Sequence, residues 1–184
     1  MSNRVIRWSV LSVILLICAL LAAQSLTLEI GLYRFSTGDF RGALPWLRVA
    51  MVLNPFTGSI RSAVATILMR QGRLDEAERI IRKNLKKHPN DSHDRNTLGM
   101  ILEKEGDVSG ALNEYHAALN AAPKNSAALF NTGYLMFKMK KYGEAREYLN
   151  RAAQISPELS KARDEILGKI PAAQSRAFSI SPAQ

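Results

Sequence analysis

The sequence predicts an all-α protein in which four helix pairs follow one another along the chain, preceded by one N-terminal transmembrane helix. Three observations lead to this fold class. The composition is rich in Leu, Ala, Ile and Val without an excess of Gly or Pro, which favours ordered helical structure. A period of 34 residues runs through most of the chain. An uncharged stretch long enough to cross a bilayer lies near the start of the chain.

The first predicted element is the uncharged stretch over residues 8–28, which follows Arg4 and Arg7. Its 21 residues would extend about 31 Å as a helix, close to the thickness of the hydrocarbon core of a bilayer. We therefore expect a short N-terminal tail over residues 1–7 and a retained transmembrane signal anchor over residues 8–28.

A cleaved signal peptide is an alternative to the anchor, because Ala22, Ala23 and Ser25 are small residues near the end of the stretch. A lipoprotein signal ending at Cys18 is disfavoured, because the residue before the lipidated cysteine is normally small and here it is Ile17. Cleavage near the end of the stretch would leave the first repeat without a capping element, which favours retention.

The positive charges around the stretch predict the orientation of the chain. Arg4, Arg7 and the amino terminus lie on one side, whereas Arg34 and the more distant Arg41 lie on the other. This bias places the N-terminus in the cytoplasm and the repeats across the membrane. In a bacterium, the protein would lie in the inner membrane with its repeats in the periplasm.

The 34-residue period appears in several residue types that keep the same phase. Prolines occupy positions 55, 89, 123 and 157, and alanines occupy positions 43, 77, 111 and 145. Small residues recur at Gly31, Ala65, Gly99 and Gly133, where they let the two helices of a pair approach closely. The turn glycines Gly38, Gly72 and Gly106 keep the period as well, with Lys140 at the fourth position. A period of this length predicts a repeat architecture.

The period divides the chain into repeats over residues 24–57, 58–91, 92–125 and 126–159. In the last two repeats, the segments RNTLGMILEKEGDVSGALNEYHAALNAAPKN and LFNTGYLMFKMKKYGEAREYLNRAAQISP resemble the tetratricopeptide repeat (TPR) family. The resemblance covers about three quarters of the chain. It implies antiparallel helix pairs stacked in a right-handed solenoid with a concave groove, used for protein association.

The ends of the repeat array depart from the regular pattern. Residues 160–170 predict an amphipathic capping helix that covers the last repeat, and residues 171–184 predict a disordered tail. In the first repeat, Pro45 falls inside the second helix, where it removes a hydrogen bond and favours a kink. The first helix of this repeat overlaps the anchor, which predicts one continuous helix from the membrane into the repeats.

The resemblance also implies where a partner binds, because ligands of the family occupy the groove lined by the first helix of each pair. Helical spacing selects twelve residues for this groove: Ser62, Thr66, Met69, Arg70, Asn96, Met100, Glu103, Lys104, Phe130, Tyr134, Phe137 and Lys138. The aromatic members of the last repeat are candidate anchors for a peptide. The alternative is that Phe130 or Phe137 packs against the capping helix.

The net charge of +9 is concentrated in the second repeat. A basic stripe there contains Arg79, Arg82, Lys83, Lys86 and Lys87. We interpret the stripe first as a solvated helix face, and second as a contact for anionic lipid or an acidic partner. Nucleic acid is not expected, because no aromatic residues interleave with the cations.

The sequence gives no pattern for catalysis, a cofactor, a metal site or a small-molecule substrate, and we expect none. Cys18 is the single cysteine, so neither an intramolecular disulfide nor a thiolate zinc site can form. The segment HPNDSHD over residues 88–94 contains two histidines, but it lies at a repeat junction where polar turn residues are expected anyway. The cations that clamp a chaperone tail in some members of the family are also missing from the matching positions.

The sequence therefore predicts a membrane-anchored scaffold that binds partner proteins to assemble or stabilise a membrane or envelope complex. A soluble secreted binding module, formed by signal cleavage, is the second hypothesis. A receptor on an organelle surface with cytosolic repeats is the third.

Overall fold

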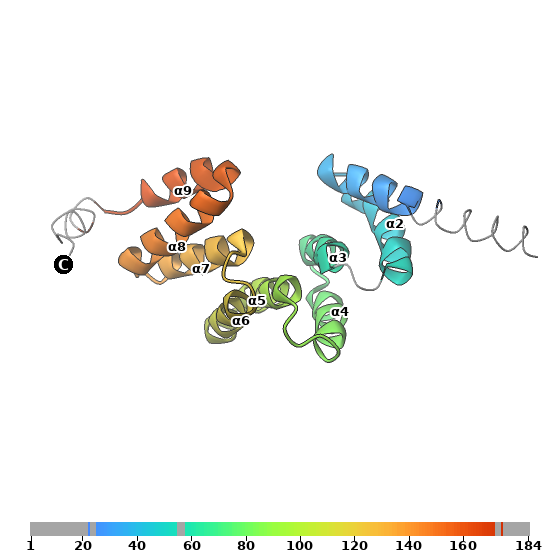
Figure 1. Cartoon of the computed structure of the whole chain (residues 1–184), viewed down its shortest axis with the longest axis horizontal. Coiled ribbons are helices and arrows are strands. Elements are labelled where there is room, and N and C mark those ends of the chain that lie inside the picture. Colours follow the sequence, from blue (N-terminus) through green and yellow to red (C-terminus); the bar gives the residue numbers. More distant parts are fainter. Residues whose placement is uncertain (1–21, 23–24, 55–57, 172–173, 175–184) are drawn as a thin grey trace, which may run out of the picture. The chain divides into compact units, whose positions relative to one another are not determined.

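The computed structural model describes residues 22, 25–54, 58–171 and 174 of the 184-residue chain. Over these residues the fold is helical and contains no strand, so the predicted all-α class is confirmed for this part of the chain (Figure 1). The contacts divide the chain into two compact units, Met1–Gly72 and Arg73–Gln184. We call them unit 1 and unit 2 and describe each by itself.

Unit 1 contains a helical segment over residues 25–36, α2 (Phe40–Leu53) and α3 (Gly58–Arg70). The segment approaches α2 closely at Gly31, where an added Cβ would lie 2.8 Å from a side-chain carbon of Leu47. Leu47 is fully buried together with the other two core residues of α2, Ala43 and Ala50. The small residue at the crossing therefore lets the large one fill the space between the helices.

The turn before α2 is fixed by Asp39, which caps that helix. Its carboxylate accepts a hydrogen bond of 2.9 Å from the backbone N–H of Gly42 and one of 2.7 Å from the guanidinium of Arg34. Both interactions favour the ionised form and hold the pKa of Asp39 below its usual range, with the Gly42 hydrogen bond the larger cause. The helix continues from Phe40 to Leu53 through Pro45, although Pro45 cannot donate to the carbonyl four residues before it.

The predicted anchor over residues 8–28 lies almost wholly outside the described residues, and so does the start of the predicted continuous helix. Residue 22 and residues 25–28 are described, and all of them are helical. Among the helices of the described part, none combines the length and the apolar character that crossing a membrane requires. The anchor stays a prediction from the sequence.

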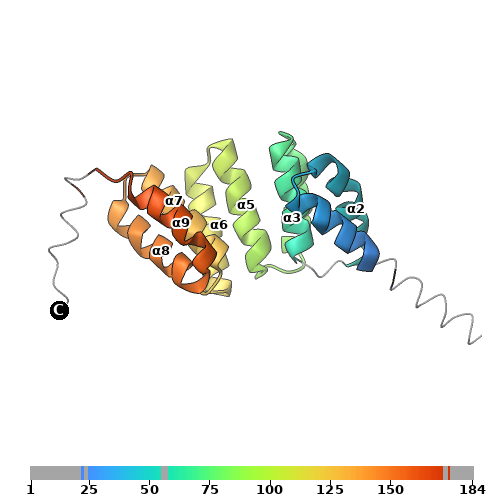
Figure 2. The same ribbon diagram turned by 90° about the horizontal axis from the view of Figure 1, so that it is seen from above.

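Unit 2 is a succession of helices in which each contacts the next. They are α4 (Leu74–Leu85), α5 (Ser92–Glu105), α6 (Val108–Ala121), α7 (Ser126–Lys138), α8 (Tyr142–Ile155), the 3-10 turn η1 (Pro157–Leu159) and α9 (Ser160–Leu167). Helices α5 and α6 lie side by side, as do α7 and α8 (Figures 1 and 2). The starts of α5 and α7 are 34 residues apart, and so are the starts of α6 and α8. The period in the sequence is therefore a period of helix positions.

Each pair in unit 2 crosses at a glycine. A Cβ added to Gly99 of α5 would lie 2.5 Å from the ring of Tyr115, and one added to Gly133 of α7 would lie 2.8 Å from Leu149. Tyr115 and Leu149 are both fully buried. These glycines leave the space in which the large side chain of the second helix packs.

Polar residues join consecutive pairs at their junctions. Asn125 caps α7 by accepting from the N–H of Ala128 at 3.0 Å, and its amide donates to the hydroxyl of Ser92 at 2.7 Å. Ser92 in turn donates to the carbonyl of Ala118 at 3.0 Å. Asp91 caps α5 in the segment that contains the two histidines, and it accepts from the N–H groups of residues 93 and 94. Turn and capping roles thus explain the polar residues of this segment.

The last helix is shorter than predicted. Helix α9 ends at Leu167 and not at residue 170, because Gly168 begins a turn in which Ile170 donates to the carbonyl of Leu167. Ile166 and Ile170 are buried as the capping role requires, whereas Ala162 is only partly buried. Of the predicted disordered tail, only residues 171 and 174 are described.

Candidate functional site

The predicted groove residues of unit 1 are only partly available at the surface. Ser62 and Thr66 of α3 are partly exposed, but Met69 is buried, with 5% of its surface accessible. Met69 falls at the edge between the predicted groove and the core, so its selection as a binding residue is corrected. The guanidinium of Arg70 lies 4.8 Å from the ring centroid of Phe40, where it makes a cation–π contact.

In unit 2, the predicted residues of α5 and α7 are brought together across the two helices. The amide of Asn131 donates to the side-chain oxygen of Asn96 at 2.9 Å, and Lys138 Nζ donates to Glu103 Oε1 at 2.9 Å. These contacts join α5 to α7 at the middle of α7 and at its C-terminal end. We call the surface that they frame, with Asn96 beneath it, the α5–α7 face: Met100, Glu103, Asn131, Tyr134 and Lys138.

Glu103 is the centre of the polar contacts on this face. Besides binding Lys138, it accepts a hydrogen bond of 3.0 Å from the hydroxyl of Tyr115 on α6. Burial and the negative charge of Glu103 raise the pKa of Tyr115 well above its usual range. The hydrogen bond to Glu103 also raises the pKa of Lys138. Tyr115 therefore stays protonated and Lys138 stays charged at neutral pH, and a residue of the core positions the carboxylate.

Tyr134 is the exposed aromatic residue of the predicted set. It is 41% exposed, and Lys138 Nζ lies 5.8 Å from the centroid of its ring. Phe137 is half-buried and packs on Tyr142 at the start of α8, with ring centroids 5.6 Å apart, while Phe130 is half-buried. A partner on this face would therefore meet one exposed aromatic ring beside the Lys138–Glu103 ion pair.

Two further residues of the predicted set lie deeper than expected. Asn96 is 7% exposed, so its role is to hold α7 through Asn131 and its selection as a contact residue is corrected. Met100 is partly buried and packs on the core cluster around Tyr115, whereas Lys104 is exposed. Asn131 was not in the predicted groove. Helical spacing selects a face, but it does not show which side chains meet across two helices.

A pocket between α6 and α8 was not predicted from the sequence. It has a volume of about 580 Å³ and is lined by His116, Leu119, Asn120, Pro123, Tyr148 and Arg151. The rings of His116 and Tyr148 are nearly parallel with centroids 6.4 Å apart, and the guanidinium of Arg151 lies 5.6 Å from the Tyr148 ring. We call it the α6–α8 pocket. Five of its residues lie on second helices and Pro123 follows the end of α6, so the pocket lies outside the groove that the family resemblance implied.

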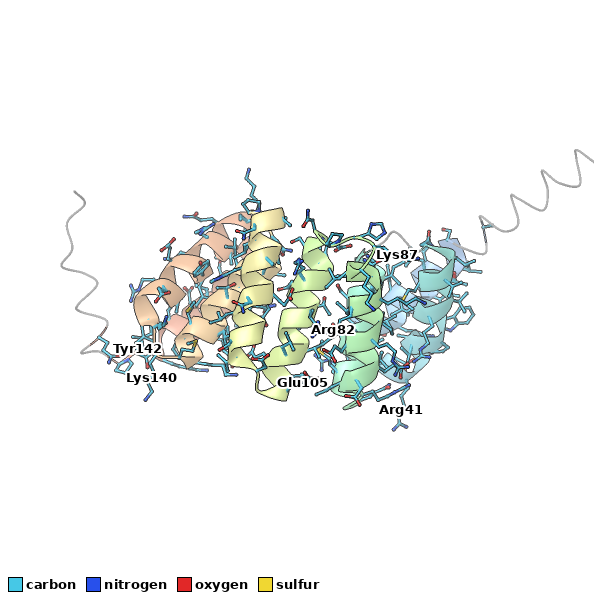
Figure 3. The ribbon with its side chains drawn as sticks, turned by 90° about the horizontal axis from the view of Figure 1, so that it is seen from below. Arg41, Arg82, Lys87, Glu105, Lys140 and Tyr142 are labelled. Carbon is cyan, nitrogen blue, oxygen red and sulfur yellow. The ribbon has the colours of Figure 1, made fainter. Side chains whose placement is uncertain are left out.

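The predicted basic stripe lies on α4 and just beyond its end. Its members Arg82 and Lys87 are labelled in Figure 3, and all five cations are exposed. Arg82 is engaged by Glu78 at 2.6 Å, so the stripe is partly neutralised within α4 itself. Glu105 at the end of α5 lies near the acidic residues of α4. Besides desolvation, the charges of Glu78 and Asp75 raise its pKa. A lipid or acidic partner for the stripe remains a prediction.

A family model described as the tetratricopeptide repeat protein 21 C-terminal ARM domain matches residues 61–170, more than half of the chain. The chain belongs to this tetratricopeptide repeat family. The matched region includes α4 to α9 and therefore the whole α5–α7 face. This result confirms the TPR-like repeat that the sequence predicted.

Two curated relatives are also tetratricopeptide repeat proteins. A TPR repeat-containing protein of Pseudomonas aeruginosa is 30% identical over 95 residues, which are 51% of this chain and 16% of that protein. Tetratricopeptide repeat protein 6 of Homo sapiens is 33% identical over 60 residues, which are 33% of this chain and 12% of that protein. The chain therefore spans less than a fifth of the length of these relatives.

Solved TPR structures share the fold at low sequence identity. A thermophilic TPR protein of Thermus thermophilus superposes with a TM-score of 0.70 at 16% identity, covering 88% of this chain and 93% of that one. A TPR protein described as having an unusual peptide-binding site superposes with a TM-score of 0.52 at 20% identity, covering 77% of this chain and 74% of that one. At these identities, the likeness concerns the fold alone.

Proposed function

We propose that this TPR protein is a membrane-anchored scaffold that binds another polypeptide through the α5–α7 face. The observation that carries the proposal is the exposed ring of Tyr134 beside the Lys138–Glu103 ion pair, on a surface braced by contacts between α5 and α7. TPR proteins are in general scaffolds without enzymatic activity. The proposal accordingly assigns the chain no reaction.

The bracing of the face favours binding, because its side chains need little reordering when a partner arrives. Glu103 is held by both Tyr115 and Lys138, so the two charges next to Tyr134 keep fixed positions. Pre-organised contacts lose less conformational entropy on association than mobile ones. An aromatic ring among such contacts is the kind of residue that dominates the energy of many protein interfaces.

The membrane part of the proposal comes from the sequence. Residues 8–28 are uncharged and long enough to span, and Arg4 and Arg7 before them favour a cytoplasmic N-terminus. We propose a single-pass protein whose repeats lie across the membrane, in the periplasm if the organism is a bacterium. Its partner would be a subunit of a membrane or envelope complex, which the scaffold assembles or stabilises.

Two alternative hypotheses keep the protein-binding role but place the repeats in a different compartment. Signal cleavage would produce a soluble secreted module, and the opposite orientation would produce an organelle-surface receptor with cytosolic repeats. The mass of the mature chain separates the first alternative from the proposal. Protease access to the repeats in sealed membranes separates the second alternative.

The test is capture of partners by the full-length tagged chain, extracted from its native membrane in mild detergent. The site variant is Tyr134→Ala with Lys138→Ala. The matched control is Tyr148→Ala with Arg151→Ala, which removes another tyrosine–cation pair of unit 2. We expect a reproducible membrane or envelope protein to co-purify with the wild type and with the control, and to be lost from the site variant.

A site variant that still captures the partner would overturn the proposed site. Loss of the partner from the control alone would move binding to the α6–α8 pocket. A mature N-terminus near residue 24, together with no membrane partner, would contradict the anchor and leave a soluble binding module.

A further inference from the structure

The outer side of α2 in unit 1 is unusually apolar for an exposed surface. Val52 is 75% exposed, Val49 48%, Leu53 41% and Trp46 37%. Their spacing of three and four residues places them on one side of the helix, away from the buried Ala43, Leu47 and Ala50. We call these four exposed residues the outer α2 face.

The second helices of the other repeats share this feature only in part, since α8 carries the exposed Ile155 at the position of Leu53. At the positions that correspond to Val52 by the 34-residue period, they carry Lys86, Asn120 and Gln154, and all three are exposed. At the positions that correspond to Val49, α4 carries Lys83 and α8 carries Arg151. The repeat architecture therefore does not require apolar residues on this side. An exposed group of large apolar side chains on one helix usually marks a contact surface.

The position of unit 1 in the chain indicates what covers the outer α2 face. The helical segment over residues 25–36 begins within the last residues of the uncharged stretch 8–28. Its twelve residues extend about 18 Å, so α2 follows within about that distance of the end of the proposed span. The segment itself exposes Leu26 and Tyr33, seven residues apart on one side.

The residue types fit the boundary between lipid and water. Trp46 and Tyr33 have amphipathic rings of the kind that gather at the headgroup level. Arg41 at the start of α2 projects away from the ribbon (Figure 3), and its long side chain can keep its charge in the headgroup region while neighbouring apolar residues enter the acyl boundary. Between residues 25 and 54 there are three arginines against two acidic residues, which suits an anionic membrane surface.

We propose that the outer α2 face docks unit 1 against the interface of the bilayer in which residues 8–28 are anchored. This inference rests on the anchor of the proposed function. Trp46 and its neighbours then lie at the level of the headgroups, and the first repeat is a membrane-contacting element and not part of the partner-binding surface.

The two tryptophans of the chain, Trp8 and Trp46, allow a direct test. The full-length protein is reconstituted into vesicles of phosphatidylcholine and phosphatidylglycerol that carry bromine either near the headgroup or near the chain end. Trp8→Phe leaves Trp46 as the reporter, and Trp46→Phe leaves Trp8. We expect Trp46 to be blue-shifted, shielded from aqueous iodide, and quenched more by shallow bromines than by deep ones.

A charge placed on the face tests the contact itself. In the Trp8→Phe background, Val52→Glu should restore quenching of Trp46 by iodide and weaken quenching by bromine. Gln154→Glu, at the corresponding position of α8, is the matched control and should change neither. Circular dichroism shows whether each variant keeps its helices.

Three results would overturn the docking. If shallow bromines quench Trp8, the first residue of the proposed span, but iodide freely quenches Trp46, the anchor stands and the docking is wrong. If no bromine quenches Trp8, the anchor of the proposed function is wrong and the docking falls with it. If Trp46 is shielded only at high protein-to-lipid ratios, a second copy of the chain covers the face in place of lipid.

Discussion

At the scale of single residues, one turn position shows how the backbone constrains the sequence. Gly38, Gly72 and Gly106 have φ values of +82°, +74° and +89°, and Lys140 at the fourth equivalent position has a φ of +62°. The left-handed conformation costs a residue with a Cβ about 1–2 kcal/mol, whereas glycine adopts it freely. Lys140 is therefore strained by the turn that ends α7.

Lys140→Gly should increase the free energy of unfolding by about 0.5–1 kcal/mol. Relief of the left-handed strain exceeds the extra entropy that glycine loses on folding, which is about 0.5–1 kcal/mol. Chemical denaturation of the full-length protein in detergent, followed by circular dichroism, measures the change. Lys141→Gly is the control, because Lys141 has a φ of −84° and should gain nothing. A Lys140→Gly variant less stable than the wild type would contradict the account of the turn.

At the scale of helices, Asn125 joins two consecutive pairs with one side chain. Its oxygen caps α7 through the N–H of Ala128, and its amide donates to Ser92 at the start of α5. The residue that caps α7 therefore also binds the start of α5, the first helix of the preceding pair. This double contact helps to position α5 and α7, the two helices of the proposed binding face.

Asn125→Ala should lower the free energy of unfolding by about 2 kcal/mol, with about 1 kcal/mol from the lost cap and about 1 kcal/mol from the lost hydrogen bond. Asn125→Asp keeps an oxygen to cap α7 but loses the donor to Ser92, so it should lose only about half as much. Denaturant titrations of the three proteins give these differences. Equal losses in the two variants would mean that the cap contributes nothing.

Glu105 at the end of α5, labelled in Figure 3, lies near the acidic residues of α4 and should make the stability of the fold depend on pH. Slight desolvation of its carboxyl and the negative charges of Glu78 and Asp75 raise the pKa of Glu105. Because the folded pKa exceeds the unfolded one, ionised Glu105 destabilises the fold at neutral pH. The penalty disappears as the pH falls below about 4.3, where the carboxyl is protonated in both states.

Glu105→Gln should therefore melt at a higher temperature than the wild type at pH 7. The gain should stay below about 1 kcal/mol, because Glu105 is exposed and water screens its neighbours. At pH 3 the two proteins should melt together. Thermal unfolding at both pH values checks this, and a gain that persists at pH 3 would show that charge is not its cause.

At the scale of the whole molecule, the 34-residue period allowed the fold to be predicted from the sequence. Gly99 and Gly133 lie where Tyr115 and Leu149 pack, because a close helix crossing accepts almost no other residue. Such steric demands leave a strong signal in the sequence. The end of α9 was predicted three residues too late, because amphipathic spacing continues to Ile170 although the helix stops at Leu167.

The candidate site could be predicted only in part. Helical spacing identified Tyr134, Lys138 and Glu103, since it shows which residues share a side of a helix. It could not find Asn131 or the bond from Tyr115 to Glu103, because contacts between helices depend on their distance and rotation. Residues of the α6–α8 pocket, such as His116 and Arg151, come from two second helices, and their meeting also depends on packing.

The most direct test of the central claim is the dissociation constant of the captured partner for the purified full-length chain, measured by calorimetry in detergent. Tyr134→Ala is compared with Tyr148→Ala, a matched change of an aromatic residue on α8. If the α5–α7 face binds the partner, Tyr134→Ala should weaken binding by about thirtyfold, as expected for an interface anchor worth about 2 kcal/mol, and Tyr148→Ala should leave it unchanged. An unchanged dissociation constant for Tyr134→Ala would contradict the account.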